Sequence, residues 1–168
     1  MLFRKQVTIG EMSKVLYAYT INENCIDELR SLSDIKNFNK QIIKKELILL
    51  KIFTIFNVLR SKKFEEKYSK KANKLFACYF KHFINEKDKN GTSESFIDLV
   101  EERAKTYNEF VEKNSNSTLK TFPFKVAEQL QDYCGLEYNA LFVSWALKNQ
   151  GEGVKLLTNM FDNFKLVD

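Results

Sequence analysis

The sequence predicts an all-α protein, a single-domain bundle of six or seven helices packed around a central apolar helix at about residues 39–59. One proline and five glycines in 168 residues are too few for a loop-rich β-sandwich. Apolar residues make up 44% of the chain and charged residues 29%, a balance typical of a globular protein rather than a disordered one. Apolar side chains also recur at helical spacing along most of the chain. A chain of this length buries roughly 70% of its unfolded surface, enough for a core without disulfides or metals.

The first helix is expected to begin at a capping box, Thr8-Ile9-Gly10-Glu11. In this motif the threonine hydroxyl accepts a hydrogen bond from the amide three residues on, and the glutamate accepts one from the cap's own amide. The residues of this helix that should face the core are Ile9, Met12, Val15, Leu16 and Tyr19. A second, short helix is expected from Asn24 to Leu32.

The central helix is expected from about Asn39 to Leu59, because apolar residues there occupy every direction around the helix axis. In its second half only Lys51, Thr54 and Asn57 interrupt the apolar run. A helix that leaves no face for water must be surrounded by its neighbours. We therefore expect the rest of the bundle to pack around it.

Further apolar stripes at helical spacing lie at about 64–85, 96–111 and 123–134, continue over 136–149, and recur at 154–164. Lys87–Glu94 is the clearest loop, and Gly135 is placed to end a helix in a left-handed conformation. Gly151–Gly153 is expected to form a turn between the last two helices. Leu141 and Val154, on either side of that turn, are expected to face inward.

Charge is divided unevenly along the chain. Residues 1–91 hold 19 Lys or Arg against 10 Asp or Glu, whereas residues 92–168 hold 8 against 12. The densest basic feature, here called the lysine stripe, lies on one side of the expected 64–85 helix and its preceding turn and consists of Lys63, Lys67, Lys70, Lys71, Lys74 and Lys81. It is either a contact surface for an anionic partner or a solvated face of a lysine-rich composition, in which lysine outnumbers arginine 23 to 4.

Motifs for catalysis or cofactor binding are scarce. His82 is the only histidine, and its spacing from Cys78 gives a weak nucleophile and base pair at best. One histidine and three separated cysteines do not make a typical zinc site or a carboxylate-bridged di-iron site. The chain also contains no glycine-rich phosphate-binding motif. No cofactor or metal is therefore expected.

Two charged residues fall within apolar stripes. Glu46 lies in the central helix, and Arg103 lies in the middle of the stripe of the 96–111 helix. Because a buried charge needs a partner, we expect Glu46 and Arg103 to form a buried ion pair. The alternative is a functional pocket that uses both groups.

These observations favour a non-enzymatic protein-binding or regulatory helical module, whose partner is another protein or a second copy of the chain, with the lysine stripe as the contact. Sequence-nonspecific nucleic-acid binding through the same stripe is the alternative, and a small-molecule enzyme with a pocket near Glu46 and Arg103 is the third hypothesis. We expect a cytoplasmic location, because no signal peptide or transmembrane segment is recognisable. The unpaired spacing of Cys25, Cys78 and Cys134 favours reduced thiols.

Overall fold

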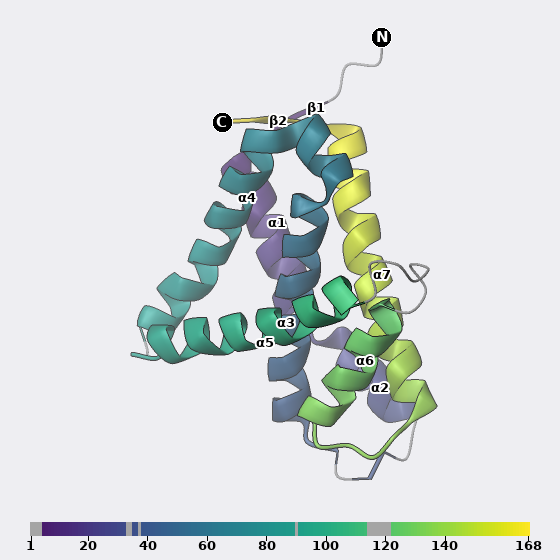
Figure 1. Ribbon diagram of the computed structural model, residues 1–168. Coiled ribbons are helices and arrows are strands. Elements are labelled where there is room, and N and C mark those ends of the chain that lie inside the picture. Colours follow the sequence, from purple (N-terminus) through teal and green to yellow (C-terminus); the bar gives the residue numbers. More distant parts are fainter. Residues whose placement is uncertain (1–4, 33–34, 37, 90, 114–121) are drawn as a thin grey trace.

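The computed structural model describes residues 5–32, 35–36, 38–89, 91–113 and 122–168, with side chains described for these residues except 30–32, 62–63, 65–70, 111–113 and 122. Over the described residues the chain forms seven helices and two short strands (Figure 1). The predicted all-α fold is confirmed. The elements in chain order are β1 (Lys5–Thr8), α1 (Ile9–Ile21), α2 (Asn24–Leu32), α3 (Lys40–Arg60), α4 (Lys62–Asp88), α5 (Ser93–Lys113), α6 (Phe122–Tyr133), α7 (Ala140–Asn163) and β2 (Phe164–Val167).

The helix starts follow the sequence closely. Thr8 caps α1 through the predicted capping box, in which its hydroxyl accepts from the Glu11 amide and the Glu11 carboxylate accepts from the Thr8 amide. Asn39 caps α3, since its side-chain oxygen accepts from the amides of Gln41 and Ile42. Such caps satisfy amides that have no partner inside the first turn of a helix.

The central position of α3 is confirmed. It runs through the middle of the molecule, and the other helices lie around it (Figure 1). Ile43, Leu47 and Leu50 of its first half, together with Phe53 of its second half, belong to a core cluster shared with α2, α5, α6 and the start of α7. Its second half contributes Ile52, Ile55 and Leu59 to another cluster, shared with α1, α4, the end of α7 and β2.

Burial of the predicted inward positions is incomplete. Ile42 is 37% exposed, Val15 50%, Leu141 55% and Val154 43%. The last three lie at the edge of the apolar arc of their helix, where the neighbouring helix no longer covers them. The first turn of α3 likewise leaves Ile42 uncovered. Phe56 is half-buried, so α3 has an open side at that position as well.

The predicted turn at Gly151–Gly153 is wrong, because α7 continues through it from Ala140 to Asn163. The reason lies in Gly153, which is buried where α7 approaches α3 and α1. A Cβ atom at this position would lie 3.3 Å from the Thr54 Cγ2 atom and 3.3 Å from the Tyr19 hydroxyl oxygen. Glycine here permits close helix packing instead of ending the helix.

A two-stranded parallel sheet was not predicted. β1 pairs with β2 in the register Lys5 to Phe164, Gln6 to Lys165, Val7 to Leu166 and Thr8 to Val167. Each strand has four residues and joins a helix without a loop, so neither leaves the alternating pattern by which a strand is recognised. Phe164, expected to be helical, instead caps the carboxyl end of α7 and starts β2.

The continuity of α7 gives a test with two glycines two residues apart. Gly151 is exposed, and a Cβ atom there would meet nothing within 4 Å. Because alanine favours a helix interior over glycine, Gly151→Ala should raise the free energy of unfolding by about 0.5–1 kcal/mol in urea denaturation. Gly153→Ala should raise the free energy of unfolding by less, because the new methyl group would be crowded by Thr54 and Tyr19. Loss of stability in Gly151→Ala would contradict a continuous helix.

The two phenylalanines on the second half of α3 should differ in their contribution to stability. Phe53 is 5% exposed and its ring lies 4.8 Å from that of Tyr107, so Phe53→Ala should cost about 3–5 kcal/mol in unfolding free energy. Phe56 is half-buried, and Phe56→Ala should cost clearly less. Urea denaturation of both variants measures the difference, and equal losses would show that Phe56 is as well packed as Phe53.

Candidate functional site

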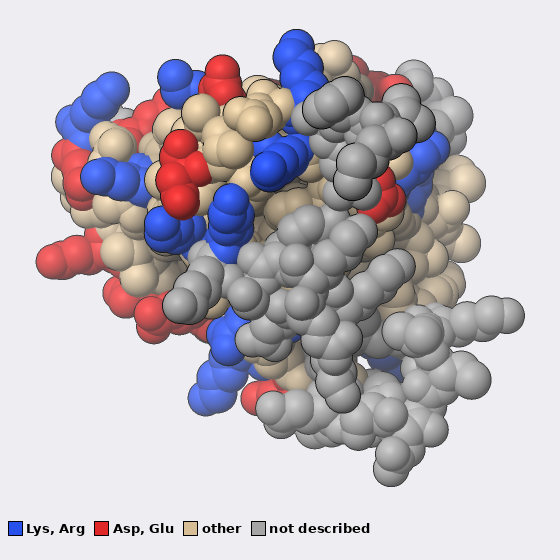
Figure 2. Space-filling view, turned by 90° about the horizontal axis from the view of Figure 1, so that it is seen from above, with Lys and Arg blue, Asp and Glu red and all other residues tan. Residues whose placement is uncertain are grey.

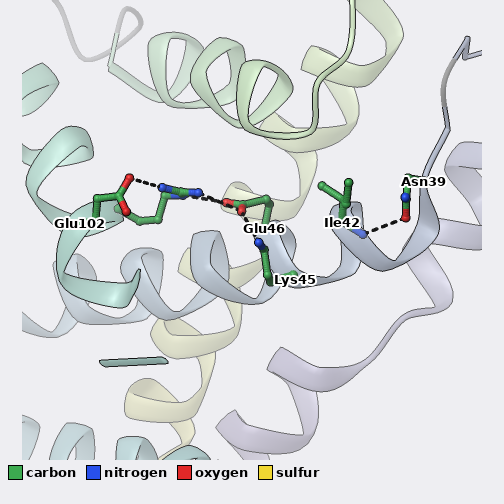
Figure 3. Close-up of polar contacts among 6 residues, drawn as sticks. Asn39, Ile42, Lys45, Glu46 and Glu102 are labelled. Carbon is green, nitrogen blue, oxygen red and sulfur yellow. Dashed lines mark hydrogen bonds and ion pairs between the residues drawn. The ribbon is translucent and has the colours of Figure 1, made fainter. Parts of the chain in front are cut away.

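The structure brings Glu46 and Arg103 together between α3 and α5. The Arg103 guanidinium donates from Nε to Glu46 Oε2 at 2.9 Å and from Nη2 to Glu46 Oε1 at 3.1 Å. Its remaining nitrogen, Nη1, donates to Glu102 Oε1 at 2.6 Å. Figure 3 shows Glu46 on α3 and Glu102 on α5, with dashed lines from each carboxylate to the Arg103 guanidinium that lies between them. Two parallel hydrogen bonds to one carboxylate are the strongest arrangement that an arginine makes.

The surroundings of this pair are those of a structural contact. Glu46 is 1% exposed, and the ring of Tyr133 lies 3.6 Å from Arg103 Cζ in a cation–π contact. The hydrogen bonds that Arg103 donates to Glu46 raise the pKa of the Arg103 guanidinium further above its ordinary value. Nearby on α6, burial raises the pKa of the Cys134 thiol to about 12, which keeps it protonated and unreactive. The pair therefore joins α3 to α5.

Beside Arg103 a cleft opens between α3, α4 and α5. In Figure 1, α4 leans away from α3 and α5 crosses back to it, so the three helices diverge on this side. The cleft has a volume of about 310 Å³ and is lined by Leu49, Ile52, Phe53, Phe56, Phe76, Phe80, Ile97, Val100, Glu101, Arg103 and Ala104. We call it the aromatic cleft. Apart from Glu101 and Arg103, every lining residue is apolar.

Aromatic rings make up one wall of this cleft. Phe56 on α3 lies 5.0 Å from Phe76 on α4, and Phe76 stacks on Phe80 at 5.8 Å between centroids. Phe80 in turn stacks on Phe96 of α5 at 6.2 Å. Offset and tilted ring pairs at these distances add to the stability that burial alone provides. The wall is therefore formed before any ligand enters.

The lysine stripe has a different environment from the one expected. Lys71 Nζ donates to the Leu166 carbonyl oxygen at 2.7 Å, and Lys74 Nζ donates to Asp168 Oδ1 at 2.9 Å. These two lysines thus bind β2 and the residue after it. Lys81 is exposed, and the side chains of Lys63, Lys67 and Lys70 lie outside the described residues. On the face shown in Figure 2, the described basic and acidic side chains are interspersed.

Cys78 and His82 do not form the pair suggested by their spacing. Cys78 is exposed, whereas His82 is half-buried with its ring against Tyr17 at 5.3 Å and its Nε2 atom 3.2 Å from the Ser13 hydroxyl. The Ser13 hydroxyl also donates to the Gly10 carbonyl at 2.8 Å. His82 thus contacts Ser13 and Tyr17 on α1, and no bond joins it to Cys78 among the described contacts.

Lys51 is a buried charge that the sequence marked only as a break in an apolar run. It is 4% exposed, and its Nζ atom donates to the carbonyl oxygens of Tyr19 and Asn22 at the end of α1. Burial lowers its pKa below the usual range. The amine borders a polar cavity of about 210 Å³ together with Cys25 and Glu152. Since it caps carbonyls that the helix leaves unpaired, Lys51 holds α1 against α3.

Metal-ligand clusters and membrane-spanning helices are both absent from the described part of the chain. Within those ranges, no three His, Cys, Asp or Glu side chains gather so as to hold a metal ion. None of the described helices has both the length and the apolar character that crossing a bilayer requires. Comparison with protein-family models, curated proteins and solved structures gives no significant match.

The buried pair can be tested by a double-mutant cycle. Removing one partner leaves the other charge with an exposed partner only, Lys45 at 3.6 Å for Glu46 or Glu102 at 2.6 Å for Arg103. Glu46→Ala and Arg103→Ala should therefore each cost about 3 kcal/mol in unfolding free energy. The double variant should cost clearly less than the sum of the two, because neither charge then remains in the interior without its buried partner. Urea denaturation of the wild type, the two single variants and the double variant gives the coupling free energy between Glu46 and Arg103. Strict additivity would show that the two groups do not stabilise each other.

Proposed function

We propose that this protein is a non-enzymatic binding module whose partner is another protein, and that the aromatic cleft is the contact. The observation that supports the proposal is the cleft itself, an open hollow with preformed, mainly apolar walls on the side of the bundle where α4 and α5 diverge from α3. Apolar surface left open to water in this way is typical of sites that bind apolar groups.

A protein partner fits the cleft better than a small molecule. Small-molecule sites fix their ligand with a few polar groups that are free to bind it. Arg103, the one cation among the described residues that line the cleft, already donates to Glu46 and Glu102. Apolar side chains of a partner need no such anchor, because burial alone contributes about 25 cal/mol per Å² of apolar surface.

The same geometry weighs against the other hypotheses. The third hypothesis placed an enzyme pocket near Glu46 and Arg103, and a cavity does adjoin Arg103, but Glu46 and Arg103 bind each other and not the space of the cavity. Nucleic-acid binding needs cations turned toward phosphates. Among the described residues of the lysine stripe, Lys71 and Lys74 are bound to the end of the chain.

A peptide selection tests the proposal. A library of random peptides is selected on the immobilised wild-type protein, and the affinities of enriched peptides are measured by fluorescence anisotropy. Ala104→Trp places an indole in the cleft and should weaken binding at least about tenfold, the effect of losing a buried apolar anchor. Ala140→Trp, at the exposed start of α7, is the matched control and should bind as the wild type does.

Two results would overturn the proposal. One is a selection that enriches no peptide, and the other is enriched peptides that bind Ala104→Trp as tightly as wild type. Should Ala104→Trp fail to fold, as judged by circular dichroism, Phe80→Leu replaces it, because this change keeps the wall apolar but removes a ring. It should weaken the same peptides relative to Ala140→Trp.

A further inference from the structure

The edge of the aromatic cleft on α5 is acidic. Glu94, Asp98 and Glu101 are all exposed, and Glu101 also lines the cleft. Their spacing of four and three residues places them within about 60° of arc on the helix, beside the cleft-lining Ile97. They form a continuous row about 10 Å long at 1.5 Å of rise per residue. We call this row the acidic edge.

Along the part of α4 whose side chains the structure describes, from Lys71 onward, the edge of the cleft has no such row. Next to the rings of Phe76 and Phe80, the helix turns Asn73 and Ala77 outward, and both are exposed. Lys81 lies further round α4 from these rings. At the α3 end of the cleft, the Arg60 guanidinium lies over the Phe56 ring at 5.1 Å. Negative charge is therefore concentrated along one edge between Glu94 and Glu101, and the exposed Lys105, one turn further along α5, ends the acidic row.

From this asymmetry we infer that the partner docks an amphipathic α-helix with lysine or arginine residues beside its apolar stripe, and that these cations lie against the acidic edge. The inference rests on the proposed function and names the chemistry of its partner. Apolar side chains at helical spacing would enter the cleft, as in other cases where an amphipathic helix occupies a hydrophobic groove. Cations four and three residues apart on the same helix would match Glu94, Asp98 and Glu101.

An extended strand fits the cleft less well. A strand binds by adding hydrogen bonds to the backbone of a sheet edge. The walls of the cleft are three α-helices, whose amides and carbonyls are paired within each helix. Only side chains face the partner, so the partner must satisfy its own backbone groups. A helix does this without help.

The net charge of the chain does not oppose this pairing. The protein carries a formal charge of +5 at pH 7. At physiological ionic strength the Debye length is about 8 Å, so exposed charges beyond that distance act weakly on a docked helix. Local charges at the cleft then decide which helix is preferred, and the row closest to its mouth is acidic.

Four synthetic peptides test the inference. Each has 20 residues with leucines at helical spacing; the flanking positions carry lysine, glutamine or glutamate, and a fourth peptide is the lysine version with two central prolines. Dissociation constants are measured by anisotropy at low and high salt. The lysine peptide should bind about tenfold more tightly than the glutamate peptide at low salt, with glutamine between them, and the preference should shrink as salt rises. The proline version should lose binding, because proline breaks a helix.

Variants of the acidic edge complete the design. The triple variant Glu94→Gln, Asp98→Asn, Glu101→Gln should bind the lysine and glutamate peptides about equally. The matched control carries Glu128→Gln, Asp132→Asn and Glu137→Gln on and after α6, which changes the net charge by the same amount, and should keep the preference for lysine.

The outcomes separate this inference from the proposed function. If lysine and glutamate peptides bind wild type equally and Ala104→Trp blocks both, the cleft binds helices without charge selection, and the inference is wrong while the proposed function stands. If the proline peptide binds as tightly as its parent, the helical partner is wrong. If none of the four peptides binds, the inference is overturned, and the random-peptide selection decides the proposed function independently.

Discussion

The need to bury α3 on nearly every side determines how the rest of the chain is arranged. Its apolar residues point in all directions, so helices from both ends of the sequence must lie against it. Two ionisable residues on the same helix must also be satisfied in the interior, and each is satisfied by a different neighbour. Glu46 is held by Arg103 of α5, and Lys51 is held by the carbonyls at the end of α1. These polar contacts fix which helix lies on which side, a specificity that apolar packing alone does not provide.

The aromatic cleft results from the way in which α4 and α5 pack against α3. Both helices are long, and they are joined by a short connection in which Gly91 adopts a positive φ of 65°. They approach each other at that connection, where Phe80, Phe83 and Phe96 stack. Away from it the two helices diverge (Figure 1). The aromatic cleft lies between them and the residues Leu49–Phe56 of α3. The opening is thus a property of the packing of three rigid helices.

Much of the fold was predictable from local rules. The capping box at Thr8, the all-round apolar stretch of α3 and the left-handed Gly135 each depend on neighbouring residues only, and all three are present. The pairing of Glu46 with Arg103 was expected from the cost of burying a charge alone. What local rules did not provide depends on distant parts of the chain. In the sequence, Gly153 indicated a turn. The structural reason for a glycine at this position is its close contact with Thr54 and Tyr19, which lie on other helices.

The candidate site was harder to predict for the same reason. The aromatic cleft combines residues from α3, α4 and α5, and each of its rings also resembles an ordinary core residue in the sequence. The lysine stripe could be predicted because it lies on one helix. The contacts of Lys71 and Lys74 with Leu166 and Asp168 could not, because they join residues far apart in the sequence. Likewise, β1 and β2 have four residues each, and neither can be recognised as a strand without the other, which lies about 160 residues away in the sequence.

Two helices, α3 and α7, extend through both core clusters. α7 contributes Phe142 and Trp145 to one cluster and Leu157 and Phe161 to the other, and α3 does the same with its two halves. Neither cluster can come apart while both helices stay straight and packed, because each helix is a single hydrogen-bonded unit. Because α3 and α7 are shared, we expect a disturbance of one cluster to reach the other, and we expect the two clusters to unfold together in one cooperative step.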